Sequence, residues 1–212
     1  MIVFIKEKLA ILSAPKTGTT SLQAALEPHA SIMFRDPPGV THINLAKYQR
    51  QIRKLLENLA DGPFETFGIV RHPLDWMGSW YCYHQRDQLK GHQNSTHGIS
   101  FDAFLTAYMS EDRPHFARVG DQARFFKPRP DDQPLDHLFQ YEQLDQAVVF
   151  LENRLGRRIQ LPHKNVSPKI DLPVSDANYQ AFQSYAADQF FAVAVRTTLM
   201  KLLLHGFRQI IK

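Results

Sequence analysis

The chain has 212 residues, of which 43% are hydrophobic and 22% charged, a composition typical of a globular domain, so residues 1–212 are expected to form a single domain. The absence of a membrane-length apolar run, of a secretory signal pattern and of any cysteine besides Cys82 argues against a membrane protein or a disulfide-bonded one, and favours a cytoplasmic location. The net charge of +4 suits a small anionic ligand, whereas the scattered lysines and arginines argue against a nucleic-acid-binding stripe.

The first half of the chain alternates short apolar runs with helical patterns. Met1–Ile5 and Leu9–Ser13 predict strands, and Leu22–Leu26 has helical spacing. Residues 29–41 are expected to be irregular because the prolines of Asp36-Pro-Pro-Gly39 oppose a helix. The elements predicted next are a helix over 44–60, a strand over 66–70, a helix from 73 to about 86 and a long loop over 87–100. The apolar face of the first of these helices consists of Leu45, Tyr48, Ile52, Leu55, Leu56 and Leu59.

The second half of the chain is expected to be mainly helical. Ser100 is placed to cap a helix that begins at Phe101. The remaining predictions are a helix over 114–126, a strand over 138–141, a helix over 142–155, a loop over 156–171 and helices over 177–191 and 192–205. Strands that alternate with helices predict an α/β, P-loop-like three-layer fold, in which a central, mostly parallel sheet is flanked by helices and binds its ligand at the strand carboxyl ends.

The segment from Ser13 to Ser21 has the composition of an anion-binding loop. It follows a predicted strand and leads into a helix, so it presents backbone N–H groups and the positive end of a helix dipole. Lys16 adds a positive charge, and Gly18 lets the backbone approach an anion closely. Hydroxyl donors are supplied by Thr17, Thr19, Thr20 and Ser21. The motif is not a Walker A loop, in which Gly-Lys-Ser/Thr ends the glycine-bounded run, and the alternative interpretation is an ordinary capped turn.

A second candidate phosphate site follows the predicted strand over 66–70. Arg71 stands at the end of that strand, and Ser79 comes about two helical turns later. A guanidinium and a hydroxyl at this spacing can hold one phosphate together. The alternative is an arginine that pairs with Asp75 and a serine that packs on its helix. If Lys16 and Arg71 follow neighbouring strands, they are expected at the same edge of the sheet.

The order of these two motifs resembles that of a known family. Pro15-Lys-Thr-Gly-Thr-Thr-Ser-Leu22 and Arg71-x-Pro-x-x-x-x-x-Ser79-x-Tyr81 are similar to the 5′-phosphosulfate and 3′-phosphate signatures of the sulfotransferase superfamily. Residues 139–144, 163–169 and 185–190 resemble supporting segments of its carbohydrate-type branch, of which a soluble, bacterial-like member is the simplest interpretation. The segment 163–169 is similar to the loop that closes over the nucleotide, which adds Lys169 to the expected contacts.

The resemblance implies transfer of a sulfuryl group from 3′-phosphoadenosine 5′-phosphosulfate (PAPS) to an acceptor hydroxyl by in-line displacement, with adenosine 3′,5′-bisphosphate (PAP) as product. It implies that Lys16 and residues 17–21 hold the phosphosulfate, that Arg71 and Ser79 hold the 3′-phosphate, and that no metal is required. The acceptor is a small molecule or a carbohydrate. The aromatic residues Trp76, Trp80, Tyr81 and Tyr83 either stack on such an acceptor or belong to the core.

An acceptor hydroxyl needs a general base. The resemblance implies a histidine or a glutamate between the two signatures, and His42 is our first choice. Asp36 is the second choice, and His84 is a third candidate, as a base or as an acceptor contact. An equally good interpretation of His42 is that it caps the following helix.

Three other functions are compatible with parts of the sequence. A P-loop kinase or NTPase would need an aspartate that ends the second strand to help hold magnesium, whereas here the second strand ends in Arg71 and the third in Tyr141-Glu142. A non-catalytic nucleotide-binding module would keep the fold without turnover. A nucleic-acid binder would need a basic surface with interleaved aromatic residues, but the aromatic residues here follow core spacing.

Overall fold

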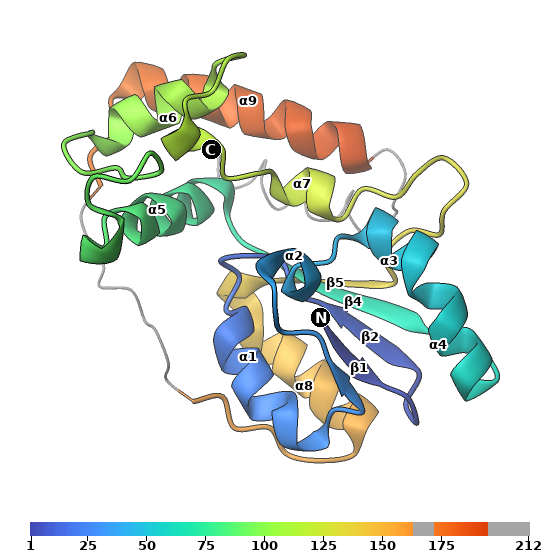
Figure 1. The fold of residues 1–212 in the computed structure, drawn as a ribbon. Coiled ribbons are helices and arrows are strands. Elements are labelled where there is room, and N and C mark those ends of the chain that lie inside the picture. Colours follow the sequence, from blue (N-terminus) through green and yellow to red (C-terminus); the bar gives the residue numbers. More distant parts are fainter. Residues whose placement is uncertain (163–171, 195–212) are drawn as a thin grey trace. The chain divides into compact units, whose positions relative to one another are not determined.

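The computed structural model describes residues 1–162 and 172–194 and has the predicted α/β class (Figure 1). The described chain packs into two compact units, which comprise residues 1–71 with 122–162 and residues 72–121 with 172–192. We call them unit 1 and unit 2. That the whole chain behaves as one domain stays a prediction. In the described ranges, no helix combines the length and the apolar character needed to cross a membrane.

Unit 1 is built on a five-stranded sheet with the strand order β3-β1-β2-β4-β5. Its strands are β1 (Ile2–Phe4), β2 (Leu9–Leu12), β3 (Ile32–Met33), β4 (Glu65–Val70) and β5 (His137–Gln140). The pairings β2 with β4 and β4 with β5 are parallel, whereas β1 is antiparallel to both β2 and β3. The sheet is therefore mixed. The reason is the short turn between β1 and β2, closed by a hydrogen bond from the Lys8 N–H to the Ile5 carbonyl, because a tight turn can join only antiparallel strands.

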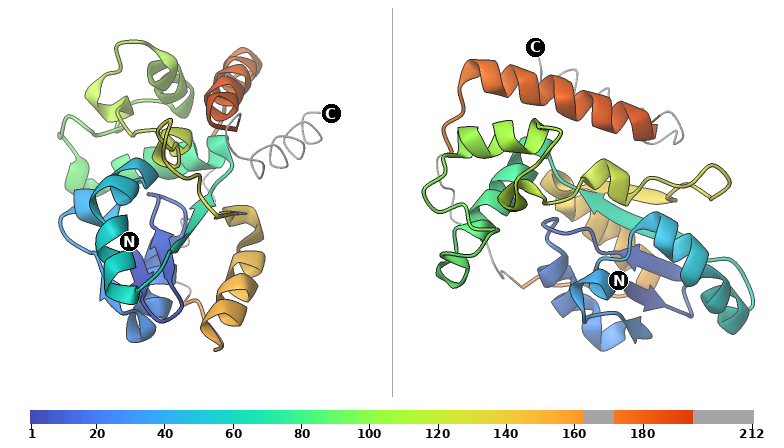
Figure 2. Two further views of the ribbon diagram at one scale, coloured as in Figure 1. Left: turned by 90° about the vertical axis from the view of Figure 1, so that its right-hand side faces the viewer. Right: turned by 45° about the horizontal axis from the view of Figure 1, so that its top comes forward.

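Helices flank the sheet on both faces, as the alternation of side chains along the strands requires. Helices α1 (Thr19–Leu26) and α8 (Leu144–Leu155) pack on one face, against Phe67 and Ile69 of β4. Helices α3 (Leu45–Gln51) and α4 (Arg53–Ala60) pack on the other, against Val70. The left view of Figure 2 shows α8 and α4 on opposite sides of the strands.

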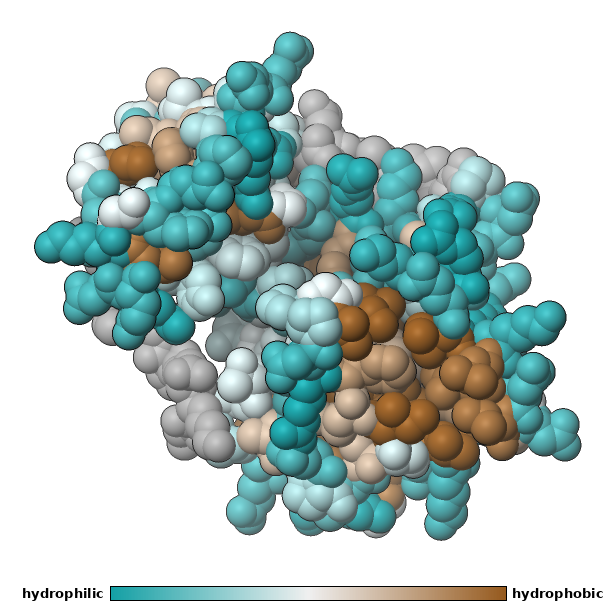
Figure 3. Space-filling view, in the orientation of Figure 1, coloured by the Kyte–Doolittle hydropathy of each residue, from teal (hydrophilic) through white to brown (hydrophobic). Residues whose placement is uncertain are grey.

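The predicted helix over 44–60 is divided in two. Asn44 caps α3 by accepting a hydrogen bond from the Lys47 N–H, but Ile52 has a φ of −117° and separates α3 from α4. Beyond this break Leu56 is buried, whereas Leu55 and Leu59 are 57% and 61% exposed. The prediction that all six apolar residues share one buried face is therefore wrong. Figure 3 shows apolar side chains gathered on this part of the surface of unit 1.

Two further predictions need correction. Residues 29–41 contain β3 and a short helix, α2 (Pro38–Thr41), because a proline is tolerated in the first helical turn, where its missing N–H costs no hydrogen bond. The predicted helix over 114–126 consists only of the 3-10 turn η3 (His115–Ala117) and the short helix α7 (Gln122–Phe125). Between them Gly120 has a φ of +86°, which ends any continuous right-handed helix.

Unit 2 has a core rich in aromatic residues. Its elements are α5 (Pro73–His84), η2 (Asp87–Leu89), α6 (Phe101–Met109), η3 and α9 (Asp176–Ala194). The Ser100 hydroxyl accepts a hydrogen bond from the Ala103 N–H, which confirms the predicted helix cap. Trp76 and Tyr81 are buried in this core, whereas Tyr83 is 38% exposed. The 3-10 turns η1 (Glu27–His29) and η4 (Tyr141–Gln143) and the short helix α7 belong to unit 1.

Candidate anion-binding site

The loop between β2 and α1 is a tight turn with two left-handed residues. Lys16 and Gly18 both have left-handed backbones, with φ of 65° and 74°. The buried Thr17 hydroxyl donates a hydrogen bond of 2.9 Å to the Ala14 carbonyl and so ties the loop to itself. The hydroxyl hydrogen of Thr17 is therefore used inside the loop, and this residue can offer an anion only its N–H. Gly18 is the N-cap residue of α1. Because glycine has no side chain, it accepts no side-chain hydrogen bond from the first-turn N–H groups of that helix.

Position 18 favours glycine not only because of its left-handed backbone but also because of a close neighbour. A Cβ atom at this position would lie 2.7 Å from Cε2 of Tyr141, well inside van der Waals contact. The aromatic ring of Tyr141 therefore packs directly on the loop backbone. Tyr141 follows the last residue of β5, so the loop after β2 and the residue after β5 meet at the carboxyl edge of the parallel strands.

The His42 side chain is hydrogen-bonded to Ser13, the first residue of the loop. Its Nδ1 lies 2.7 Å from the Ser13 carbonyl oxygen. A carbonyl oxygen only accepts hydrogen bonds, so Nδ1 carries the proton and Nε2 keeps its lone pair. Burial lowers the pKa of His42 below its ordinary value, although the hydrogen bond to Ser13 opposes this shift. At neutral pH His42 is therefore a neutral imidazole with an oriented proton acceptor, which is the arrangement that a general base needs.

Arg71 follows β4 and is held by its backbone. Its N–H donates to Oε1 of Gln122 at 2.8 Å, and its carbonyl accepts from Nε2 of the same side chain at 2.9 Å. The guanidinium carbon lies 4.8 Å from the centre of the Tyr141 ring. Its Nε is buried and has no hydrogen-bond partner among residues 1–162 and 172–194. A buried donor of this kind is satisfied when an acceptor such as a phosphate oxygen binds beside it.

The predicted site residues are distributed over both units. Lys16 to Ser21, His42 and Arg71 all belong to unit 1, where the loop and Arg71 follow the neighbouring parallel strands β2 and β4. The prediction that these two motifs share one sheet edge is thus confirmed for their backbones. Ser79 lies on α5 in unit 2 and is half-buried. Lys169 lies outside the described residues.

The other two candidates for the base have different surroundings. Asp36 is exposed in the turn that precedes α2. His84 is buried in unit 2, where its Nδ1 lies 3.2 Å from the Phe116 carbonyl oxygen. Of the three, His42 is the residue that the structure joins directly to the loop.

Sequence reasoning missed Tyr141 and Gln122 as site residues. Tyr141 had a local signal, because it comes directly after a predicted strand at the edge where ligands bind. Gln122 had none. It acts on Arg71 from 51 positions away, through hydrogen bonds that no short-range pattern reports.

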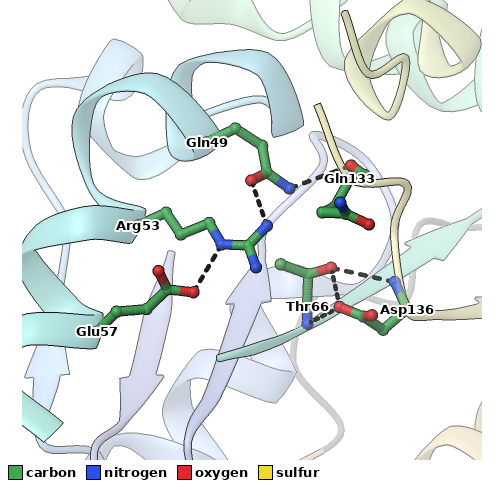
Figure 4. Close-up of polar contacts among 6 residues, drawn as sticks. All are labelled: Gln49, Arg53, Glu57, Thr66, Gln133 and Asp136. Atoms are coloured by element: carbon green, nitrogen blue, oxygen red, sulfur yellow. Dashed lines mark hydrogen bonds and ion pairs between the residues drawn. The ribbon is translucent and has the colours of Figure 1, made fainter. Parts of the chain in front are cut away.

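A cavity of about 640 Å³ lies at the opposite, amino-terminal ends of β2 and β4. Figure 4 shows the polar network beside it. Arg53 donates to Glu57 at 2.7 Å and to Gln49 at 2.8 Å, while Asp136 accepts from the Thr66 N–H and hydroxyl at 2.7 and 2.8 Å. These groups satisfy one another and fasten the segment before β5 to the sheet.

Comparison with known proteins adds no assignment. No protein-family model matches the chain, and no curated protein matches it significantly. In the part of the chain that the structure describes, no three histidine, cysteine, aspartate or glutamate side chains are grouped to hold a metal ion. The loop, His42 and Arg71 are therefore the groups whose geometry bears on function.

Proposed function

We propose that the chain is a sulfotransferase that binds PAPS at the loop between β2 and α1 and transfers its sulfuryl group to an acceptor hydroxyl, of a small molecule or a carbohydrate. On this proposal unit 1 is a P-loop-like fold, with Lys16 and the loop amides on the 5′-phosphosulfate and Arg71 on the 3′-phosphate. The carrying observation is that the loop, His42 and Arg71 share the carboxyl edge of β2 and β4.

The reaction uses each of these groups once. The acceptor oxygen attacks sulfur and loses its proton to Nε2 of His42, while the bond between sulfur and the bridging oxygen breaks. The bridging oxygen leaves as part of the 5′-phosphate of PAP. Negative charge grows on that oxygen in the transition state, so a lysine ammonium and backbone N–H groups placed beside it lower the barrier. Protonated His42 then releases its proton to solvent.

The main alternative is a P-loop kinase, and the residues at the strand ends argue against it. A kinase of this type holds magnesium with a loop hydroxyl and an aspartate that follows a neighbouring strand. Here β4 is followed by Arg71 and β5 by Tyr141. A cation and a phenol at these two positions suit a second phosphate group better than a metal ion.

Turnover of labelled donor tests the proposed activity. PAPS carrying ³⁵S is incubated with the protein and EDTA, with and without a panel of phenols and simple sugars. We expect slow hydrolysis of PAPS to PAP and sulfate in every sample that contains protein, faster formation of PAP with a suitable acceptor, and transfer of the label to that acceptor. Intact donor together with magnesium-dependent consumption of ATP would favour the kinase. Binding of PAPS without any turnover would favour a non-catalytic module.

A further inference from the structure

Tyr141 contacts both of the groups to which the proposed site assigns a phosphate. Val70 and Gln140 are partners in the register of β4 and β5, so Arg71 and Tyr141 leave the sheet side by side. One edge of the Tyr141 ring packs on Gly18 of the loop, where an added Cβ would meet Cε2 at 2.7 Å. The Arg71 guanidinium carbon lies 4.8 Å from the centre of the same ring. One side chain therefore spans the space between the loop and the arginine.

The ring is also the contact that orients the Arg71 side chain. Gln122 fixes only the backbone of Arg71, through its N–H and its carbonyl. Within the described residues, Nε of Arg71 has no hydrogen-bond partner. A guanidinium that stacks on an aromatic face is held as a plane, which fixes the directions of its N–H groups toward a planar or bidentate partner.

We infer that Tyr141 is a positioning residue that holds the Arg71 guanidinium at a fixed distance from the loop and thereby sets which pairs of phosphates fit. The inference rests on the proposed function, since it assigns the two anions to one nucleotide. Selection of a 3′-phosphate then depends on Gly18 in the loop and on Arg71 and Tyr141, which follow β4 and β5. Loss of the ring should leave the 5′-phosphate site in place and release Arg71 from its orientation.

The test is an affinity ratio measured by calorimetry. It is the Kd of adenosine 5′-monophosphate divided by the Kd of PAP. Both ligands contain adenosine and the 5′-phosphate, so any change in those contacts cancels, and the ratio reports the 3′-phosphate alone. For the unaltered protein we expect a ratio of at least about ten, the size that charge-assisted hydrogen bonds to a phosphate provide.

Two substitutions separate positioning from simple packing. Tyr141→Phe keeps the aromatic face and should leave the ratio within about twofold of its original value. Tyr141→Leu keeps an apolar side chain but removes the face, and should lower the ratio about tenfold while the Kd of adenosine 5′-monophosphate changes by less than about threefold. Thermal unfolding of each variant shows that it is folded. If Tyr141→Leu does not fold, Tyr141→Met fills the space with a flexible chain and carries the same expectation.

The outcomes distinguish this inference from the proposed function. A ratio near one in the unaltered protein would overturn both, because no 3′-phosphate would then be recognised. A high ratio that survives in Tyr141→Leu would leave the proposed function standing and overturn the positioning role. A purely structural role predicts an equal loss of affinity for both ligands, with the ratio unchanged, and that result would also overturn it.

Discussion

Replacement of Lys16 by alanine is expected to lower the rate of sulfuryl transfer by about 10²–10³-fold, the range found when one donor to a developing charge is removed. The leaving 5′-phosphate gains negative charge as the S–O bond breaks, and the ammonium stabilises the transition state more than the bound donor. The loss should therefore appear mainly in kcat. Lys16 has a left-handed backbone, and alanine also carries a Cβ, so the substitution adds no new backbone strain.

A matched control is Lys6→Ala. Lys6 is an exposed lysine in the turn between β1 and β2, at the opposite end of β2 from the loop. This variant removes the same charge from the protein and should keep the original rate. If Lys16→Ala turned over within threefold of the unaltered enzyme, the assignment of Lys16 to the leaving group would be wrong.

Replacement of His42 by asparagine should lower kcat by about 10²–10⁴-fold, the usual contribution of a general base. Asparagine can still donate from its amide to the Ser13 carbonyl, the partner of Nδ1, but it has no group that accepts a proton. Donor binding should therefore be retained while turnover is lost. His29→Asn is the control, because His29 is exposed at the end of the turn that follows α1.

The pH dependence of activity tests the role of His42 as general base independently of the rate loss. The base is active when neutral, so kcat/KM, which reports the groups of the free enzyme, should rise with pH through the pKa of His42 and be flat above it. Burial lowers that pKa from its ordinary value of 6.5, and the acid limb should lie below pH 6.5. The limb should disappear in His42→Asn. Retention of both the rate and the limb in this variant would exclude His42, and Asp36→Asn would be the next substitution to examine.

The same pKa shift links His42 to stability. The folded state favours the neutral imidazole, so the unfolded chain binds more protons between the folded pKa and 6.5. The stabilising contribution of His42 is complete above pH 6.5 and is lost as the pH falls through the folded pKa. The acid limb of activity and the loss of stability can therefore overlap, and unfolding should be followed in the same buffers as turnover.

The parts of the site that sequence could predict are those with local causes. A buried apolar run that turns into a small, glycine-containing segment identifies the loop, and an arginine after the next apolar run identifies Arg71, because strand ends are short-range features. His42 could be named as a candidate from the resemblance alone. Its tautomer could not, because that depends on a hydrogen bond to a residue 29 positions away.

The errors have causes that act over longer distances or through single backbone angles. The helical pattern over 44–60 is real, but the φ of −117° at one residue, Ile52, interrupts the helix, and Leu55 and Leu59 are exposed. The left-handed Gly120 similarly interrupts the predicted helix over 114–126. Gln122 and Tyr141 gain their roles only when the sheet brings β4, β5 and the loop together, and no periodicity in the sequence records that contact.

The central claim is that the site selects two separated phosphates without a metal, and a calorimetric comparison of PAP with ADP tests it most directly. Both ligands carry an adenosine with two phosphates, but only PAP presents a 3′-phosphate to Arg71. We expect PAP to bind at least about tenfold more tightly than ADP, with the same affinity in EDTA and in magnesium. Equal affinities for the two ligands, or binding that EDTA abolishes, would contradict the account.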